Sequence, residues 1–140
     1  MEFETPILIV DDNAAAIAEI GAILKTLKIR YDEAYNGLHA YDKVINKGKA
    51  NYKIILMDTN MPILNGFESA IKINEELSKS GEKTNIIAVA ATSDDRLKEV
   101  VKNAGMREYI VKPITQQDIM ILLKKYAHSV FVSLRPKPKM

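Results

Sequence analysis

The hydrophobic pattern of this 140-residue chain alternates between two kinds of segment. Short continuous apolar runs, too short for buried helices, are typical of strands covered on both faces of a parallel sheet. Longer segments with apolar residues three and four positions apart are typical of amphipathic helices. The apolar runs are residues 7–10, 30–34, 54–57, 85–90 and 107–111, of which 30–34 is the weakest. Their alternation with helical segments predicts a doubly wound α/β domain.

A helical stripe follows each apolar run, and we expect these stripes to face the sheet. Asn65 with Glu68, and Thr115 with Asp118, have the spacing of capping boxes at helix starts. Gly81 is placed to end the helix that begins after Asn65. The stripes are Ile17, Ile20, Leu24 and Leu27; Ala40, Val44 and Ile45; Phe67, Ala70, Ile71, Asn74 and Leu77; Leu97, Val100, Val101 and Ala104; and Ile119, Leu122, Leu123 and Tyr126.

The last segment of the chain differs from the rest in composition. Residues 128–134 include several apolar side chains, and residues 135–139 are basic and interrupted by proline. We therefore expect one domain over residues 6–127, followed by a C-terminal extension or linker over 128–140. A strand that binds a partner, or exchanges between two copies, is the alternative for this extension.

Charged residues stand where three of the predicted strands end. Asp58 directly follows the run 54–57, the pair Asp11 and Asp12 follows the run 7–10, and Lys112 follows the run 107–111. In open α/β sheets, the carboxyl ends of parallel strands meet at one edge, where ligands bind. Three carboxylates at that edge would repel one another and be driven towards protonation. We therefore expect a cation among them.

Composition and charge exclude several classes of protein. The chain is 47% hydrophobic and 27% charged, which is typical of a globular domain. A net charge of +2 is too small to indicate nucleic-acid or membrane binding, and the absence of cysteine excludes disulfides and thiolate metal sites. The acidic N-terminal residues lack the pattern of a signal peptide, and no apolar run approaches the ~20 residues of a membrane span. We expect a soluble, cytoplasmic protein or fragment.

Three motifs at the strand ends together resemble one family. They are Ile-Val-Asp-Asp-Asn at 9–13, Leu-Met-Asp-Thr-Asn-Met-Pro at 56–62 with Asn-Gly at 65–66, and Tyr-Ile-Val-Lys-Pro at 109–113. This combination resembles the receiver domain of two-component response regulators, over about residues 6–127, and is most similar to the receivers of hybrid sensor histidine kinases. The resemblance implies a flavodoxin-like (βα)5 fold, a doubly wound parallel sheet with strand order 2-1-3-4-5.

The resemblance also implies a phosphoacceptor and a metal site. Asp58 would accept a phosphoryl group from a phosphohistidine in a Mg²⁺-dependent transfer, and the domain would then signal by a conformational change. Asp11 and Asp12 would hold Mg²⁺ together with Asp58 and the backbone carbonyl of Asn60. Such a site suits Mg²⁺, which keeps several waters and takes few carboxylates directly, and the cation offsets the repulsion between the two reacting anions.

Two further residues have roles that the resemblance implies. Lys112 would contact a phosphoryl oxygen, for which a compact point charge is suited. Pro113, often preceded by a cis peptide bond in the family, would aim Lys112 into the site.

The domain would catalyse its own phosphorylation and dephosphorylation without turning over an external substrate. Its partner would be a histidine kinase or a histidine phosphotransfer domain, without direct contact to nucleic acid or membrane, and its oligomeric state stays open.

One position departs from the family pattern. Ala90 stands where the family usually has Thr or Ser, whose hydroxyl bonds the new phosphoryl group, and a methyl group cannot donate that hydrogen bond. Thr92 would have the same side-chain parity if the strand continued, and could then substitute for it. Tyr109 occupies the aromatic switch position of the family. We therefore expect phosphorylation to occur but the conformational switch to be weakened.

Three other functions compete with this interpretation. A pseudo-receiver that binds partners without phosphorylation is favoured by Ala90 and opposed by the intact set of acids and lysine. A phosphohydrolase of the haloacid dehalogenase type would have an Asp where this chain has Asn60, and needs room for a cap domain. A flavin carrier of the same fold would bind phosphate after the first strand, where Asp11 and Asp12 would repel it.

Overall fold

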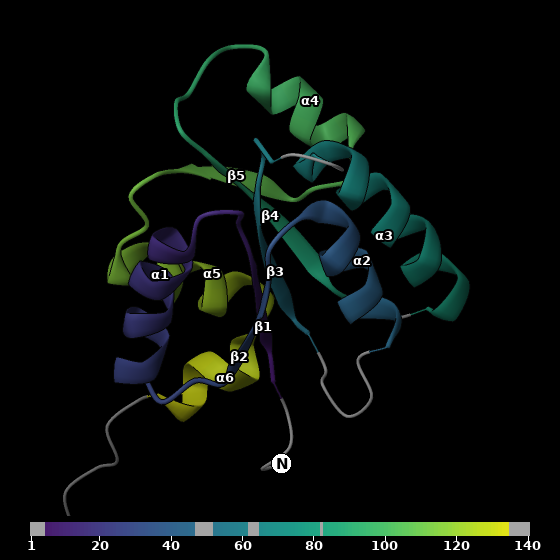
Figure 1. The fold of residues 1–140 in the computed structure, drawn as a ribbon. Helices are drawn as coiled ribbons and strands as arrows, with labels where there is room; N and C mark the ends of the chain where they lie inside the picture. The colour runs from purple at the N-terminus through teal and green to yellow at the C-terminus, as the bar shows by residue number, and fades with distance from the viewer. Residues whose placement is uncertain (1–4, 47–51, 62–64, 82, 135–140) are drawn as a thin grey trace, which may run out of the picture.

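The elements alternate between strand and helix along almost the whole chain, as Figure 1 shows. The computed structural model describes residues 5–46, 52–61, 65–81 and 83–134. The strands are β1 (Ile7–Val10), β2 (Tyr31–Ala34), β3 (Ile54–Asp58), β4 (Asn85–Ala90) and β5 (Glu108–Val111). The helices are α1 (Ala14–Thr26), α2 (Gly37–Ile45), α3 (Gly66–Ser80), α4 (Leu97–Asn103), α5 (Gln116–Tyr126) and α6 (His128–Ser133).

The strands form one parallel sheet in the order β2-β1-β3-β4-β5. The predicted doubly wound fold and strand order are therefore confirmed. The strands β2 and β5 begin one residue later than the hydrophobic pattern indicated, at Tyr31 and Glu108. A shift of one residue at an element end is ordinary, and the N–H of Arg107, just before β5, already donates to the carbonyl oxygen of Ile86 in β4.

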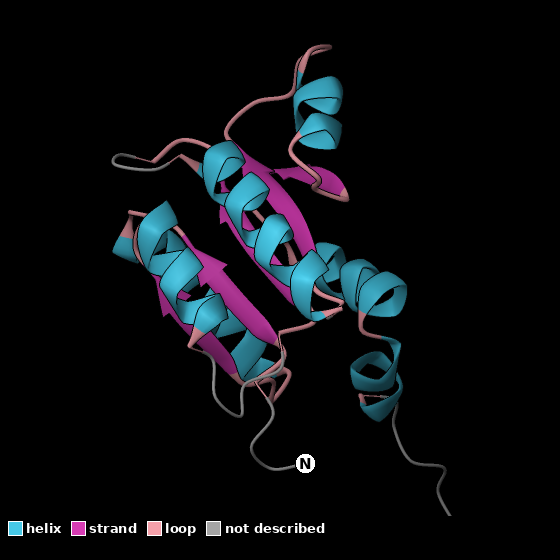
Figure 2. Cartoon of the chain, turned by 90° about the vertical axis from the view of Figure 1, so that its right-hand side faces the viewer, coloured by secondary structure: helices cyan, strands magenta, loops and turns pink. Residues whose placement is uncertain are grey.

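Helices cover both faces of the sheet, as Figures 1 and 2 show. One apolar cluster joins the sheet to α2, α3 and α4, and a second joins it to α1, α5 and α6. Successive residues of a strand point to opposite faces, so Ile55 belongs to the first cluster and Leu56 to the second. This two-sided burial explains why β1 and β3 are apolar at consecutive positions, each such side chain contributing about 1.5–3 kcal/mol.

Both predicted capping boxes are present. The Asn65 side chain accepts the Glu68 N–H and the Glu68 carboxylate accepts the Asn65 N–H, and Thr115 and Asp118 form the same reciprocal pair. Gly81 ends α3 in the left-handed conformation, with a φ of 72°. The predicted start of α3 after Asn65 and its predicted end at Gly81 are thus confirmed.

Three residues assigned to the helical stripes face outward instead. Ile45, Ile71 and Val100 are 47%, 45% and 39% exposed, so these assignments were wrong. In α3 the buried positions are Gly66, Ser69, Ala70, Ile73 and Leu77, a face that passes through Ser69 and excludes Ile71. Ser69 tolerates burial because its hydroxyl donates to the carbonyl oxygen of Gly37 in α2, at 2.8 Å. Apolarity alone therefore placed the face of this helix incorrectly.

The expected C-terminal extension begins with a helix. In α6, Val130 and Phe131 pack against the cluster under α1 and α5, and Leu134 joins them just beyond the helix. Residues 135–140, the basic part of the extension, lie outside the described residues. Within the described part of the chain, none of the helices combines the length and the apolarity that crossing a membrane requires.

Candidate functional site

The acidic side chains meet at the carboxyl edge of the sheet because β1 and β3 are paired in parallel. Val10 lies opposite Met57, so Asp11 follows β1 at the level where Asp58 closes β3. Asp11 and Asp58 are 2% and 5% exposed, whereas Asp12 is exposed. One carboxylate oxygen from each of the three lies within 4.8 Å of the others. The expected cluster of carboxylates is therefore present, and its oxygen atoms could hold a metal ion.

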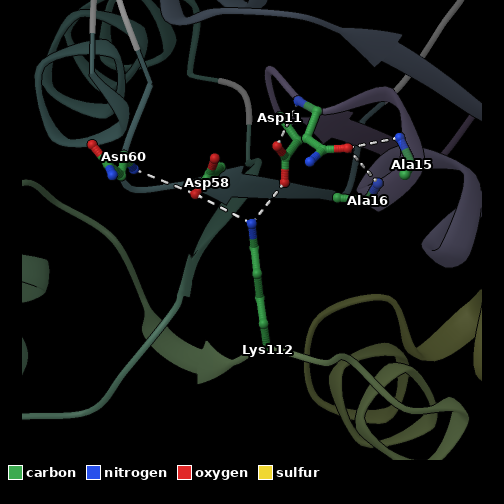
Figure 3. A network of polar contacts seen from close by, with 7 residues as sticks. Asp11, Ala15, Ala16, Asp58, Asn60 and Lys112 are labelled. Carbon is green, nitrogen blue, oxygen red and sulfur yellow. Dashed lines mark hydrogen bonds and ion pairs between the residues drawn. The ribbon is translucent and has the colours of Figure 1, made fainter.

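Lys112 supplies the cation expected among these carboxylates. Its Nζ lies 3.0 Å from Oδ2 of Asp11 and 3.7 Å from Oδ1 of Asp58. Figure 3 marks both contacts with dashed lines. The backbone N–H of Lys112 donates to the carbonyl oxygen of Ala90 at 2.8 Å, and this hydrogen bond fixes the backbone of Lys112 beside the end of β4. The peptide bond between Lys112 and Pro113 is cis. The side chain thus reaches across the edge of the sheet from β5 to β1 and β3.

The loop after β1 holds Asp11 in place from the other side. Oδ1 of Asp11 accepts the backbone N–H of Asn13 at 2.9 Å. The Asn13 side chain in turn caps α1 by accepting the N–H groups of Ala15 and Ala16, at 2.8 and 3.2 Å. Because Asn13 performs the capping, the carboxylate of Asp12 stays available at the cluster.

The environment of Asp58 opposes its ionised form. Burial, and next the nearby charge of Asp11, raise the pKa of Asp58 from 3.8 to about 6. The N–H of Asn60, 3.3 Å from Oδ1, and the charge of Lys112 act in the opposite direction and are outweighed. Because burial and the charge of Asp11 disfavour the ionised carboxylate, a cation bound beside Asp58 would strongly stabilise its ionised form.

Lys112 responds to the same cluster. Burial lowers its pKa, but the hydrogen bond to Asp11 and the charges of Asp58 and Asp11 together raise it above the usual value. The lysine is therefore charged throughout the neutral pH range, and it is the positive group that the described structure places against the two buried carboxylates.

A glycine allows α3 to start close beside Asp58. A Cβ atom on Gly66 would collide with the backbone carbonyl of Asp58. In the structure Asn65 caps α3, and Gly66 is the first residue of the helix. The requirement for glycine is this close approach, which the sequence pattern did not reveal.

A cleft of about 460 Å³ opens over these groups. Sequence reasoning did not identify Phe67, Asp94 and Leu97 as part of its wall. Asp94 had a recognisable signal, since an Asp three residues before a helical stripe is a typical cap, and its carboxylate accepts the N–H groups of Arg96 and Leu97. The predicted site residues in the wall are Asp11, Asp12, Asp58, Asn60, Ala90, Thr92 and Lys112.

The three predicted switch positions lie at the end of β4, in the loop that follows it, and in the neighbouring β5. Ala90 is the last residue of β4 and is 3% exposed, with its methyl group in the wall of the cleft. Thr92 also lines the cleft, but β4 has ended before it, so the condition for it to share the side-chain parity of Ala90 is not met. The hydroxyl of Tyr109 lies 2.9 Å from that of Ser93, a contact that sequence reasoning missed because its residues belong to different elements.

Comparison with known proteins adds an independent finding. Residues 7–124 match the sequence model of the response regulator receiver domain. A hybrid signal transduction histidine kinase of Dictyostelium discoideum, its kinase F, is 35% identical over 122 residues, which are 86% of this chain and 11% of that protein. This chain therefore spans only a small part of the curated relatives of this kind that it matches.

Solved structures agree with this match. The receiver domain of Ssk1 from Saccharomyces cerevisiae, crystallised with the histidine phosphotransfer protein Ypd1, is 25% identical with a TM-score of 0.79, and the alignment covers 91% of this chain and 92% of that one. The receiver domain of a Pseudomonas aeruginosa sensor histidine kinase, solved with a magnesium ion in its active site cleft, is 27% identical with a TM-score of 0.77. That alignment covers 89% and 98% of the two chains.

Proposed function

We propose, because this chain belongs to the family of response regulator receiver domains, that Asp58 is its phosphoacceptor. The observation that carries the proposal is the position of Asp58, at the end of β3 beside a second buried carboxylate and 3.7 Å from Lys112. A carboxylate in this position is nucleophilic when ionised, and the cleft gives a donor access to it. We propose a phosphohistidine as the donor.

In the transfer, a carboxylate oxygen of Asp58 forms a bond to phosphorus as the bond from phosphorus to the histidine nitrogen breaks. The electron pair of the broken bond stays on the imidazole, which takes up a proton and leaves as neutral histidine. Asp58 then carries an acyl phosphate. Lys112 remains within reach of the transferred group because its Nζ already lies between Asp11 and Asp58. Its charge stabilises the equatorial oxygens of the phosphoryl group during transfer.

The residues at this edge fit Mg²⁺. All the candidate donors are oxygen atoms, and one from each of Asp11, Asp12 and Asp58 already converge within 4.8 Å. We propose that these carboxylates and the backbone carbonyl of Asn60 hold the ion, which when bound neutralises negative charge shared by the acceptor and the phosphoryl group. The raised pKa of Asp58 supports this proposal, since the protein alone leaves its negative charge incompletely balanced.

We propose a histidine kinase or a histidine phosphotransfer domain as the partner. The yeast receiver crystallised with a phosphotransfer protein supports this choice. The surface next to the cleft is also open to a partner, because Ala14 and Ala15, at the start of α1, are exposed and small. The domain would act either as a separate relay protein or as a module of a hybrid kinase, and a cytoplasmic location stays a prediction.

A pseudo-receiver is the second candidate, and the buried methyl group of Ala90 is the observation that favours it. At the end of β4 this side chain offers no hydroxyl to a phosphoryl group. In that case the domain would bind its partners through its surface, independently of phosphorylation. The two candidates differ in whether Asp58 reacts, so one experiment separates them.

The test is incubation with a small phosphodonor such as acetyl phosphate, with and without Mg²⁺, followed by intact mass measurement over time. We expect a Mg²⁺-dependent gain of one phosphoryl group that Asp58→Asn abolishes. Asp94→Asn is a matched control, because Asp94 lines the same cleft outside the carboxylate cluster and the Asn side chain can also accept the N–H groups of Arg96 and Leu97. A folded wild-type protein that gains no mass in the presence of Mg²⁺ would refute the phosphoacceptor and leave the pseudo-receiver.

A further inference from the structure

A second groove, of about 930 Å³, lies along β2 at the open edge of the sheet. It shares no lining residue with the cleft at the carboxylate cluster. In Figure 1, β2 lies between α1 on one side and α2 on the other. The groove therefore borders the backbone of an edge strand and side chains from both faces of the sheet.

Four cations line this groove. Lys25 comes from α1, Lys28 and Arg30 come from the turn between α1 and β2, and Lys43 comes from α2. None of them is in an ion pair with another of the described residues. Because α1 and α2 cover opposite faces of the sheet, the cations flank the edge from both sides.

Two acidic residues also line the groove, but each of their carboxylates accepts a hydrogen bond from a tyrosine hydroxyl. Oδ2 of Asp32 accepts the hydroxyl of the buried Tyr52 at 2.6 Å, and Oε1 of Glu33 accepts the hydroxyl of Tyr35 at 2.9 Å. The cations are thus not neutralised by these carboxylates in direct pairs. The groove keeps an excess of positive charge that an anionic partner could use.

The backbone of β2 offers unpaired hydrogen-bonding groups along the same groove. The carbonyl of Ala34 accepts the N–H of Asp11, so the peptide groups of Ala34 face β1. By the alternation of a strand, those of Tyr31 and Glu33 face outward, where no other described strand pairs with them. The next outward N–H, that of Tyr35, donates to Nδ1 of His39 at 3.1 Å. This N–H is therefore already paired and does not face a partner strand as an open donor. The open part of the edge is the stretch beside the cations.

We propose that this groove binds an acidic, extended peptide segment of a partner protein, which adds to β2 as a further strand. Its backbone would pair with the outward groups of Tyr31 and Glu33, and its acidic side chains would point alternately towards the α1 and α2 faces. There they would meet Lys25 on one face and Lys43 on the other. Two outward residues allow only a short ladder, so the contact would be weak and sensitive to salt.

Charge distinguishes this occupant from the two nearest alternatives. A second copy of the chain pairing through β2 would bring two sets of cations together, and lysine at an edge strand disfavours such pairing. The chain's own residues 135–139 are basic and carry the same sign as the groove. An acidic segment from another protein meets neither obstacle.

Lys28 allows binding to be separated from folding. Its φ of 59° is in the left-handed region, at the position after α1 where glycine is usual. Lys28→Gly therefore removes a cation of the groove and relieves the backbone at the same time. We expect this variant to keep or raise the thermal midpoint and to weaken peptide binding, a combination that loss of folding cannot produce.

The test uses the full chain and a fluorescein-labelled peptide of eight residues in which pairs of Val alternate with pairs of Glu, so that Glu side chains point to both faces. Binding is followed by fluorescence anisotropy and amide NMR. We expect binding with shifts at the amides of Tyr31 and Glu33. A Val and Lys peptide, and a Val and Glu peptide N-methylated at alternate positions, should each bind about tenfold or more weakly. The first peptide lacks the negative charge, and the second lacks backbone N–H donors. Lys28→Gly and Lys43→Gln should each weaken binding about threefold.

Lys72→Gln is the charge-matched control, because Lys72 is exposed on α3 and does not line the groove. It should leave the affinity unchanged. Equal binding of the N-methylated peptide would overturn strand addition, and no binding of the Val and Glu peptide would overturn the proposal altogether. Tighter binding of a short single-stranded oligonucleotide than of any peptide would assign the groove to nucleic acid instead, and would also overturn it.

Discussion

Removing the charge of Asp58 should stabilise the fold when no metal is bound. Burial and the charge of Asp11 raise the pKa of Asp58 from 3.8 to about 6, which means that the folded protein disfavours the ionised carboxylate. Asn has nearly the same shape as the protonated acid and carries no charge. Asp58→Asn should therefore raise the free energy of unfolding of the Mg²⁺-free protein.

The size of the effect follows from the two pKa values. The difference between 3.8 and about 6 corresponds to about 3 kcal/mol once both folded and unfolded carboxyl groups are ionised. Because the pKa of Asp58 is higher in the folded than in the unfolded protein, the free energy of unfolding of the wild-type protein falls by this amount as the pH rises from about 4 to above 6. The advantage of the variant should thus be near zero below pH 4 and reach about 3 kcal/mol at pH 7.5.

The assay is urea unfolding followed by circular dichroism at several pH values, with a chelator present. Asp12→Asn is the control, because Asp12 belongs to the same cluster but is exposed, and its substitution should change stability by less than about 0.5 kcal/mol. Adding Mg²⁺ should stabilise the wild-type protein and narrow the gap to Asp58→Asn, since a ligand stabilises only the form that binds it. A gain that is absent, or equally large at pH 4 and pH 7.5, would contradict the electrostatic reasoning.

Three further substitutions test the site and the core. Ala90→Thr should enlarge the phosphorylation-dependent amide shifts between residue 90 and Tyr109, and shifts unchanged by phosphorylation in both proteins would count against a weakened switch. Lys112→Met should slow phosphorylation from acetyl phosphate about 100-fold, and should lower the stability of the Mg²⁺-free protein by about 1–2 kcal/mol because two buried carboxylates lose their cation. Ser69→Ala should lower the free energy of unfolding by about 1 kcal/mol, measured in urea, because the Gly37 carbonyl loses a buried donor; no change would mean that this bond adds nothing.

The order of the elements and the composition of the candidate site were readable from short stretches of sequence. A continuous apolar run predicts a strand with two covered faces, and the charged residue after it marks the edge of the sheet where it ends. Asp11, Asp58 and Lys112 were found in this way, each from its own strand end. The capping boxes at Asn65 and Thr115 are equally local, because all of their atoms lie within four successive residues.

Only the tertiary structure decided how these local pieces meet. It brings Lys112 within 3.0 Å of Asp11 across 101 positions of sequence. It also joins the hydroxyl of Tyr109 to Ser93, and it places Ile73 rather than Ile71 in the core. The groove along β2 likewise combines side chains from α1, α2 and the turn between α1 and β2. The physical reason is that a repeating pattern specifies which face of an element is apolar, whereas the rotation of each helix and the contacts between elements depend on which neighbours fill the same space.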